Sequence, residues 1–429
     1  MDSDTNDVLP LQELSLDEAI TEVELEESYE EDEEDELEEY VTLGTIEKPK
    51  HPKFLLRHLF PSKTGGTPAW LDPVELPTGK FSRCDFCEEP LQFLLQANIF
   101  LFLLIYAPIP EKESTFHRML YVFICPSMSC ILQDQHEQWK RREEDPRRSI
   151  KVFRCQLPRL NVFYSSEPPR KDGNDKPLSV GAALCSWCGT WKGEKVCSGC
   201  KQARYCCEKH QAMHWKSGHK NRCHHIIHNL ESISSSLPGE KLSRDKVACS
   251  SLWPEYEIAI EDECAYDAEA SEDASYEASS LVTQHVPDDT YQFLLDKFEA
   301  DDNKRSWASF QERISKCPSQ VLSKESILIV DDVIFNRYSR DLMANPLWPL
   351  SIGRPSMTNI PKCKYCNGSL CYEFQIMPQI LYYLGVKNDS DSLDWGTIVI
   401  YTCLASCEAS ARYKEEFIWV QLYPTAPIS

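Results

Sequence analysis

The sequence predicts a mainly β protein in which two related modules pack into one domain, with a small cysteine-rich α+β finger inserted between them. Three observations predict this arrangement. The order Cys-x-x-Cys, strand-like run, second strand-like run and second cysteine pair occurs twice, beginning at Cys84 and at Cys363. A dense group of cysteines and histidines lies between the two copies, and an acidic stretch precedes each copy. Because internal repetition marks repeated structural units, the two copies indicate a duplicated β module.

Changes in composition along the 429 residues predict the boundaries. Residues 1–40 include the run Glu30–Glu36, whose like charges repel and which offers too little apolar surface to fold, so an acidic disordered tail is expected there. The expected order is then an N-terminal β module at 41–164, a linker at 165–180, the finger at 181–230, an acidic linker at 231–288 and a C-terminal β module at 289–429.

Composition also narrows the compartment and the class of partner. Hydrophobic residues make up 42% of the chain, which is enough for a core. No apolar run approaches the roughly 20 residues of a membrane span. Residues 1–39 lack a basic start followed by an apolar stretch, so no signal peptide is expected and the cysteines should remain reduced. The formal net charge of −23 favours a basic partner over nucleic acid or a membrane. We therefore expect a soluble cytoplasmic protein, with shuttling to the nucleus or nucleolus left open.

The two flanking modules each carry four cysteines in a spacing typical of zinc sites. Reduced Cys-x-x-Cys pairs favour zinc, and four thiolates form a closed structural site. The alternative is that some of these cysteines are buried free thiols. The predicted ligand sets are Cys84, Cys87, Cys125 and Cys130 in the first module, and Cys363, Cys366, Cys403 and Cys407 in the second.

The central segment offers eight further ligands, enough for two zinc ions. They are Cys185, Cys188, Cys197, Cys200, Cys206, His210, His219 and Cys223. The last four form two pairs at spacing i, i+4, which share a face if these segments are helical. Cys207 is the weaker alternative to Cys206, because its side chain would point the other way on an extended segment. The neighbouring histidines are expected at the surface: His214, His224, His225 and His228.

This segment resembles the MYND zinc finger. The resemblance rests on the two Cys-x-x-Cys pairs, Tyr205-Cys206, Trp215 and His219-Lys-x-x-Cys223, although His210 stands where most MYND fingers have cysteine. In that family the ligand pairs interleave. The resemblance therefore implies one zinc on Cys185, Cys188, Cys206 and His210, and the other on Cys197, Cys200, His219 and Cys223.

No pattern in the chain predicts an enzyme. Closed sites lack the open position that a catalytic zinc needs, and the common metalloprotease, phosphate-loop and serine-nucleophile motifs are absent from the sequence. Gly65-Gly66 is interpreted as a tight turn before a buried Trp70 rather than as a phosphate loop. The short basic patch Lys140–Arg142 is interleaved with acidic neighbours and predicts a solvated helix face rather than a nucleic-acid site.

Outside the finger, the chain resembles the programmed cell death protein 2 family over most of its predicted ordered length. The resemblance rests on phrases in both modules, among them Gly65-Gly-Thr-Pro-Ala-Trp70, Val152-Phe-Arg-Cys-Gln-Leu-Pro158, Phe374-Gln-x-Met-Pro-Gln379 and Glu415-Glu-Phe-x-Trp419-Val-Gln. Ala97–Leu104 and Ser323–Asn336 interrupt such phrases, and we interpret them as isoform or gene-model insertions.

The family resemblance implies a non-enzymatic role in ribosome biogenesis, as a dedicated chaperone or adaptor of a newly made protein of the small (40S) subunit. Such clients are basic, which suits an acidic chain. Trp70, Trp348 and Trp395 are expected either in the core or in the client-binding surface. The alternative function is a nuclear adaptor of transcriptional regulation, in which the MYND finger binds proline-containing peptides.

Overall fold

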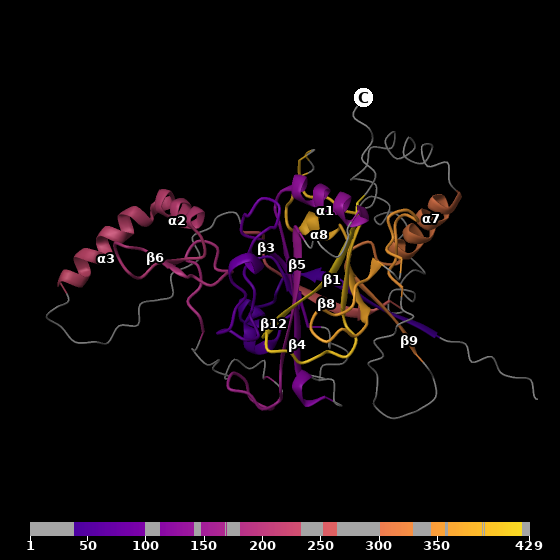
Figure 1. The fold of residues 1–429 in the computed structure, drawn as a ribbon, viewed down its shortest axis with the longest axis horizontal. Coiled ribbons are helices and arrows are strands. Elements are labelled where there is room, and N and C mark those ends of the chain that lie inside the picture. Colours follow the sequence, from indigo (N-terminus) through magenta and orange to yellow (C-terminus); the bar gives the residue numbers. More distant parts are fainter. Residues whose placement is uncertain are drawn as a thin grey trace, which may run out of the picture. The chain divides into compact units, whose positions relative to one another are not determined.

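The computed structural model contains a barrel and a zinc-finger fold (Figure 1). It describes residues 38–98, 112–140, 147–167, 169, 181–232, 252–263, 301–328, 345–356, 359–387, 389 and 391–422. Among these residues, ten strands form a closed barrel in the order β1-β8-β2-β3-β4-β5-β12-β11-β10-β9. No helix in this part of the chain combines the length and the apolar character needed to cross a membrane.

The barrel strands come from both predicted modules. The first half of the chain supplies β1 (Glu38–Glu47), β2 (Lys63–Thr64), β3 (Gln92–Ala97), β4 (His117–Ile124) and β5 (Ile150–Leu157). The second supplies β8 (Tyr256–Asp262), β9 (Gln320–Leu328), β10 (Leu370–Ile376), β11 (Thr397–Cys403) and β12 (Tyr413–Gln421). The prediction of a mainly β fold with two modules in one domain is therefore confirmed.

The first strand of each half pairs with the other half. β1 pairs antiparallel with β9, whereas β8 pairs with β2, and β1 and β8 pair with each other. The other junction is formed by β5 and β12. The first strand of each module is thus inserted next to strands of the other module. Without the other module, the five strands of either one would not form a continuous sheet.

One interpretation of the domain boundaries was wrong. The interval 231–288 was expected to be an acidic linker, yet it contains β8, whose residue Ile258 is buried in the barrel. The acidic residues of β8 alternate with apolar ones, so that one face of the strand can be buried while the other stays polar. Strand β1 likewise begins at Glu38, within the interval assigned to the acidic tail.

Matching irregularities support the duplication. The β3–β4 ladder shifts register between Phe93 and Leu95, and the β10–β11 ladder shifts between Tyr372 and Phe374. Phe93 and Tyr372 both lie six residues after the second cysteine of their knuckle. Bulges at equivalent positions are designed structural features rather than accidents of packing.

A buried glutamine also plays the same role in both halves. The side-chain amide of Gln96 accepts a hydrogen bond from Ala69 N (2.7 Å) and donates one to Pro61 O (2.9 Å). The amide of Gln375 accepts from Leu347 N (2.7 Å) and donates to Leu347 O (3.0 Å). Each glutamine thereby fastens the loop that carries the Pro-x-Trp or Pro-Leu-Trp sequence of its module.

Helices cover parts of the barrel. They are α1 (Met128–Lys140), α7 (Asp301–Lys316) and the short α8 (Ile380–Tyr383). Phe310 and Ile314 of α7 pack on Met377, while Ile380 of α8 joins the apolar cluster of the barrel interior. Trp395 lies in that interior cluster and Trp70 in the cluster outside β4, both buried, so these two tryptophans are core residues. Trp348 is half-buried against a third cluster.

The barrel also contains two ion pairs that join the halves. Arg118 of β4 donates to both carboxylate oxygens of Glu373 on β10, at 2.9 and 2.8 Å, and to Thr402 on β11. Arg154 of β5 donates to Glu416 of β12. All four charged side chains are almost completely buried. Because buried charges are tolerated only when they are paired, these contacts fix how the halves face each other.

The Gly65-Gly66 turn gives a prediction about stability. Both glycines have positive φ (67° and 61°), and a Cβ on Gly65 would lie 1.8 Å from Pro254 O. Gly79 also has positive φ (61°), but a Cβ there would meet nothing within 4 Å. We expect Gly79→Ala to cost about 1–2 kcal/mol, and Gly65→Ala to cost about 1–3 kcal/mol more, because a clash adds to the strain. Urea denaturation of the two variants measures this difference, and equal losses would contradict the close approach of Pro254 to this turn.

A buried histidine predicts a pH dependence. His117 packs against the rings of Phe60 and Tyr164, and burial lowers the pKa of His117 to about 3. The unfolded chain therefore takes up this proton below about pH 6.5 while the folded chain does not, so stability falls as the pH decreases. We expect His117→Phe to show a smaller loss of unfolding free energy than the parent between pH 7.5 and 5.5. The unfolding free energy is measured by urea denaturation at each pH. If it falls equally with pH in both proteins, this contribution of His117 is ruled out, since protonation of the zinc ligands affects both alike.

Candidate metal centres and the finger surface

The N-terminal flanking site is built on a knuckle and on the end of a strand. Cys84 and Cys87 precede β3, Cys125 follows β4, and Cys130 lies in the first turn of α1. The four sulfur atoms lie within 4.8 Å of one another, with Cys87 and Cys125 3.6 Å apart. Zinc–sulfur bonds of about 2.3 Å in a tetrahedron place sulfurs about 3.8 Å apart, so the set fits zinc. The thiol of Cys125 donates a hydrogen bond that lowers the pKa of Cys84 to about 5, which favours the thiolate that zinc requires.

The C-terminal site repeats this geometry. Its sulfurs lie at 3.7 Å (Cys363 and Cys407) and 3.6 Å (Cys366 and Cys403). The residue after each knuckle adopts positive φ, at Glu88 (60°) in the first copy and Asn367 (59°) in the second. In both copies its amide donates to the carbonyl of the first cysteine, which closes the turn around the metal position.

The C-terminal site is coupled to the ion pairs of the barrel. Glu416 accepts a hydrogen bond from Cys403 N (3.1 Å) through one oxygen and pairs with Arg154 through the other. Arg154 in turn approaches Cys407 Sγ at 3.8 Å. Four thiolates around one Zn²⁺ carry a net charge of −2, so a buried guanidinium beside them offsets part of it.

The finger brings its eight predicted ligands into two interleaved sets. The first contains Cys185, Cys188, Cys206 and His210, and the second contains Cys197, Cys200, His219 and Cys223. His210 Nδ1 lies 3.1 Å from Cys206 Sγ and 3.7 Å from Cys185 Sγ. In the second set, Cys197 and Cys223 lie 3.8 Å apart. Both sets have the donor types and spacing of closed zinc sites.

Local structure explains which residues become ligands. The finger contains the hairpin β6 (Lys195–Val196) and β7 (Arg204–Tyr205), then α2 (Glu208–His214), a π-helical segment (Trp215–His219) and α3 (Lys220–Ser232). Cys207 is the N-cap of α2 and accepts a hydrogen bond from His210 N, so it lies outside the metal sets. Gly218, with φ of 127°, bends the chain between the helices, next to the ligand His219.

One histidine was assigned wrongly. His214 was expected at the surface but is buried, with its Nδ1 3.1 Å from the hydroxyl of Tyr205 and its ring stacked on His219. It therefore holds the ring of a ligand in place rather than binding metal itself. His224 and His225 are exposed as expected. The side chain of His228 lies outside the described residues.

The finger packs against the outer face of the first module. Trp191 donates from Nε1 to Leu91 O (2.8 Å), and its ring lies 4.4 Å from that of Phe123. In the reverse direction, Trp70 donates to Thr190 O (2.9 Å). Each of these buried tryptophans donates a hydrogen bond to the other part, so the finger belongs to the core of the first module. No pattern in the sequence indicated this arrangement.

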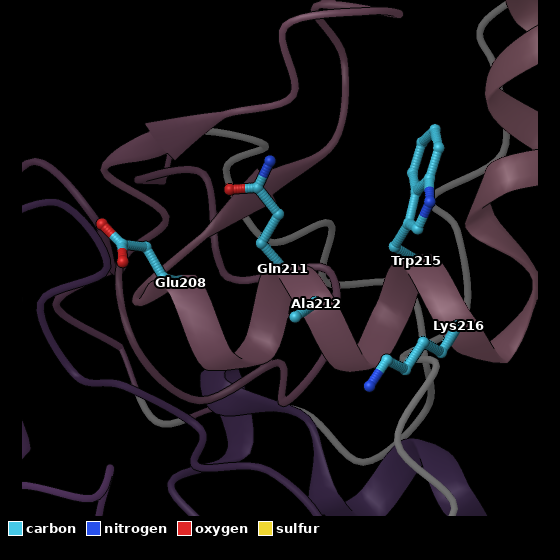
Figure 2. A pocket seen from close by; sticks show the side chains of 5 residues that line it. All are labelled: Glu208, Gln211, Ala212, Trp215 and Lys216. Atoms are coloured by element: carbon cyan, nitrogen blue, oxygen red, sulfur yellow. The ribbon is translucent and has the colours of Figure 1, made fainter.

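The surface of the finger carries an open notch of about 320 Å³, lined by residues of α2 and of the segment that follows it. Figure 2 shows Gln211 and Trp215 projecting from the same side of the helix, with Glu208 and Lys216 at the ends of the notch. The indole of Trp215 is 39% exposed. Tryptophan is enriched at surfaces that bind other proteins, so this notch is a candidate contact surface.

Comparisons with known proteins agree with the geometry. The chain matches the family model for the N-terminal domain of programmed cell death protein 2 at residues 40–171, the one for its C-terminal putative domain at 304–422, and the MYND finger at 185–223. Programmed cell death protein 2 of Rattus norvegicus is 33% identical over 390 residues, covering 89% of this chain and 96% of the rat protein. That of Bos taurus is 34% identical over 391 residues, covering 88% and 95%. Programmed cell death protein 2-like of Homo sapiens is 24% identical over 375 residues, covering 85% and 90%.

No solved structure matches this chain. The match to relatives is nevertheless nearly end to end, and the two family domains contain the two flanking zinc sites, while β8 lies between the two domain matches. The MYND match likewise covers the segment that holds the two interleaved sets. The chain belongs to the programmed cell death protein 2 family.

Proposed function

We propose that this protein is a non-enzymatic ribosome-biogenesis factor that chaperones one newly made, basic protein of the small ribosomal subunit. The observation that carries the proposal is the distribution of charge on a zinc-stabilised scaffold. The chain has a net charge of −23, yet residues 185–223 of the finger contain eight Lys or Arg and only two Asp or Glu. Residues 1–37 contain 17 Asp or Glu and no Lys or Arg, and residues 264–300 contain nine Asp or Glu and one Lys. The excess of carboxylates therefore belongs mainly to these two segments, which is where a basic client would find counter-charge.

The four metal sets support a scaffold rather than a catalyst. Each has four protein ligands, so a zinc ion bound there retains no position for water or substrate. Such sites contribute folding free energy, and they lie at the ends of the barrel strands and in the finger. The proposed setting is the cytoplasm, where ribosomal proteins are made, followed by passage to the nucleus.

A tagged pull-down from cells, repeated at rising salt and analysed by mass spectrometry, tests this function. We expect one basic small-subunit protein in near-stoichiometric amount, without RNA and without the rest of the subunit. Because the contact is largely between opposite charges, its recovery should decrease as salt increases. Recovery of no ribosomal protein, or of whole subunits only, would refute the chaperone role.

A second function is favoured by the notch at Trp215. A nuclear adaptor would use this surface to bind proline-containing peptides of transcriptional regulators. Trp215→Ala should then abolish binding to an immobilised library of such peptides. Met213→Ala is the matched control, because Met213, at the end of α2 and two residues before Trp215, is similarly exposed (37%) but does not line the notch. Equal binding by both variants would exclude the notch as the peptide site.

A further inference from the structure

Strand β1 closes the barrel and is its N-terminal strand. It lies between β8 and β9 and pairs with both, with Gly44 opposite Ile260 on one side and Leu322 on the other. No other strand that the structure describes precedes it in the chain. Among the described strands, β1 is joined by the chain to its successor β2 alone, so it can leave the sheet without moving another described strand.

The inward-facing residues of β1 contribute little to the core. A Cβ on Gly44 would point at Leu322 Cβ (2.9 Å) and Ile258 Cγ2 (3.1 Å), which belong to the interior cluster. On the same face, Thr42 is buried but small and polar, and Ile46 is only half-buried. By comparison, β4 places Leu120, Val122 and Ile124 in the same cluster, all completely buried. Since burial of each large aliphatic side chain is worth about 1.5–3 kcal/mol, the interior holds β1 far more weakly than β4.

The outward-facing side of β1 buries Val41 and Leu43 (6% and 1% exposed), apart from the main apolar clusters. Val41 and Leu43 form a small separate cluster with Cys317. At the end of the strand, Glu47 stands directly opposite Glu257 of β8, which has Lys63 of β2 opposite it on its other side. Like charges at directly opposed positions destabilise a strand pair. A strand with a basic residue at the position of Glu47 would remove this repulsion.

From these observations we infer that β1 is an exchangeable closing strand, and that an extended, basic segment of the client takes its place between β8 and β9. This inference rests on the proposed chaperone function for the identity of the occupant, but not for the exchange itself. The position between β8 and β9 favours a small residue in place of Gly44, an apolar one in place of Leu43 and a basic one in place of Glu47.

Exchange is feasible because the incoming strand restores the backbone hydrogen bonds that β1 gives up. Addition of a strand to a sheet edge obtains its affinity from these main-chain bonds and its selectivity from alternate side chains. The net free energy is then decided by the side chains. Besides buried Val41 and Leu43, β1 contributes a glycine, a half-buried isoleucine and a glutamate opposite another glutamate. A client strand with a basic residue at the position of Glu47 replaces the repulsion with an attraction to Glu257.

The exchange can be tested on the full-length chain with a fluorescein-labelled peptide of residues 38–47. In the parent protein the tethered β1 has an effective concentration in the millimolar range, so micromolar peptide should not displace it. In Gly44→Val the native strand no longer fits beneath Leu322, and we expect at least tenfold more peptide to be retained on size-exclusion chromatography. Gly396→Val perturbs the barrel near Gln421 instead and should retain no more than the parent does.

Two further arms identify the cause. A labelled peptide carrying valine in place of Gly44 should not be retained by any of the proteins. The small-subunit protein from the pull-down should prevent uptake of the peptide of residues 38–47. If it does not, the client does not occupy the position of β1, although exchange of the strand is still established. If the peptide is never retained, exchange itself is refuted, whatever the pull-down recovers.

Hydrogen exchange of the unmodified chain keeps the inference testable if Gly44→Val does not fold. The amides of β1 should exchange faster than those of β4 and β11, because opening requires only that one strand leave. Equal protection of all three strands would overturn the inference.

Discussion

Replacing Cys403 with alanine is expected to remove one zinc ion per chain and to unfold the barrel. Cys403 is completely buried at the end of β11, and its sulfur lies 3.6 Å from that of Cys366. Binding of a structural zinc is worth about 10–16 kcal/mol in small zinc domains, which equals or exceeds the whole stability of a typical domain, about 5–15 kcal/mol. Loss of one ligand should therefore exceed what the rest of the core can offset.

Cys371→Ala is the matched control for this prediction. Cys371 is equally buried on the neighbouring strand β10, but its sulfur contacts Thr402 O and lies outside the metal set. It should keep the full zinc content and lower the melting temperature by only a few degrees, as expected for about 1 kcal/mol. Zinc is measured by elemental analysis and folding by circular dichroism. Retention of zinc and fold by Cys403→Ala would show that this site is not structural.

Substituting Glu373 with glutamine is expected to destabilise the protein by about 3–5 kcal/mol, the usual cost of leaving one member of a buried ion pair without its counter-charge. The guanidinium of Arg118, which is completely buried, would lose the carboxylate that accepts two of its hydrogen bonds. Thr402 would also lose its bond to this carboxylate. The unfolding free energy from urea denaturation measures the loss.

A double substitution separates the ion pair from simple packing. Arg118→Met with Glu373→Met removes both charges and retains much of the buried volume. Replacement of a buried pair by apolar residues is often neutral or stabilising, so the double variant should be more stable than Glu373→Gln alone. Additive losses in the double variant would indicate that the two side chains act independently, against the geometry described above.

The architecture of paired modules was predictable because its signal is local. Each knuckle, its following strand and its second cysteine pair occupy a short stretch of chain, so a repeat of the pattern at Cys84 and Cys363 is visible without knowledge of the fold. The two metal sets of the finger were predictable through resemblance, since spacing alone does not reveal which pairs interleave. The structure then brings the same eight side chains into those sets.

The exchange of first strands was not predictable, because it joins segments about 190 to 290 residues apart. The assignment of β8 to a linker failed for a different reason. Its acidic residues dominated the composition of the region, although Tyr256, Ile258 and Ile260 alternate with polar or small residues. That period of two is typical of a half-buried strand, and it was the signal that could have identified β8.

The two interrupting segments are only partly described. Ala97 ends β3 and pairs with Leu120, and Ser323 to Leu328 continue β9 beyond the family-like phrase. The remainder of Ala97–Leu104 and of Ser323–Asn336 lies outside the described residues, apart from Asn98. Their origin as isoform or gene-model insertions stays a prediction. His214 was misjudged because its burial depends on Tyr205, a contact across the finger rather than along the helix.

The most direct test of the proposed role is a solubility assay with individually synthesised clients. Each protein of the small ribosomal subunit is made in a cell-free system with and without the full-length chain, and its soluble fraction is measured at physiological salt. The account predicts that one basic member becomes soluble in the presence of the chain while the others do not change. If no member responds, or if all basic members respond equally as to any polyanion, a dedicated chaperone function is contradicted.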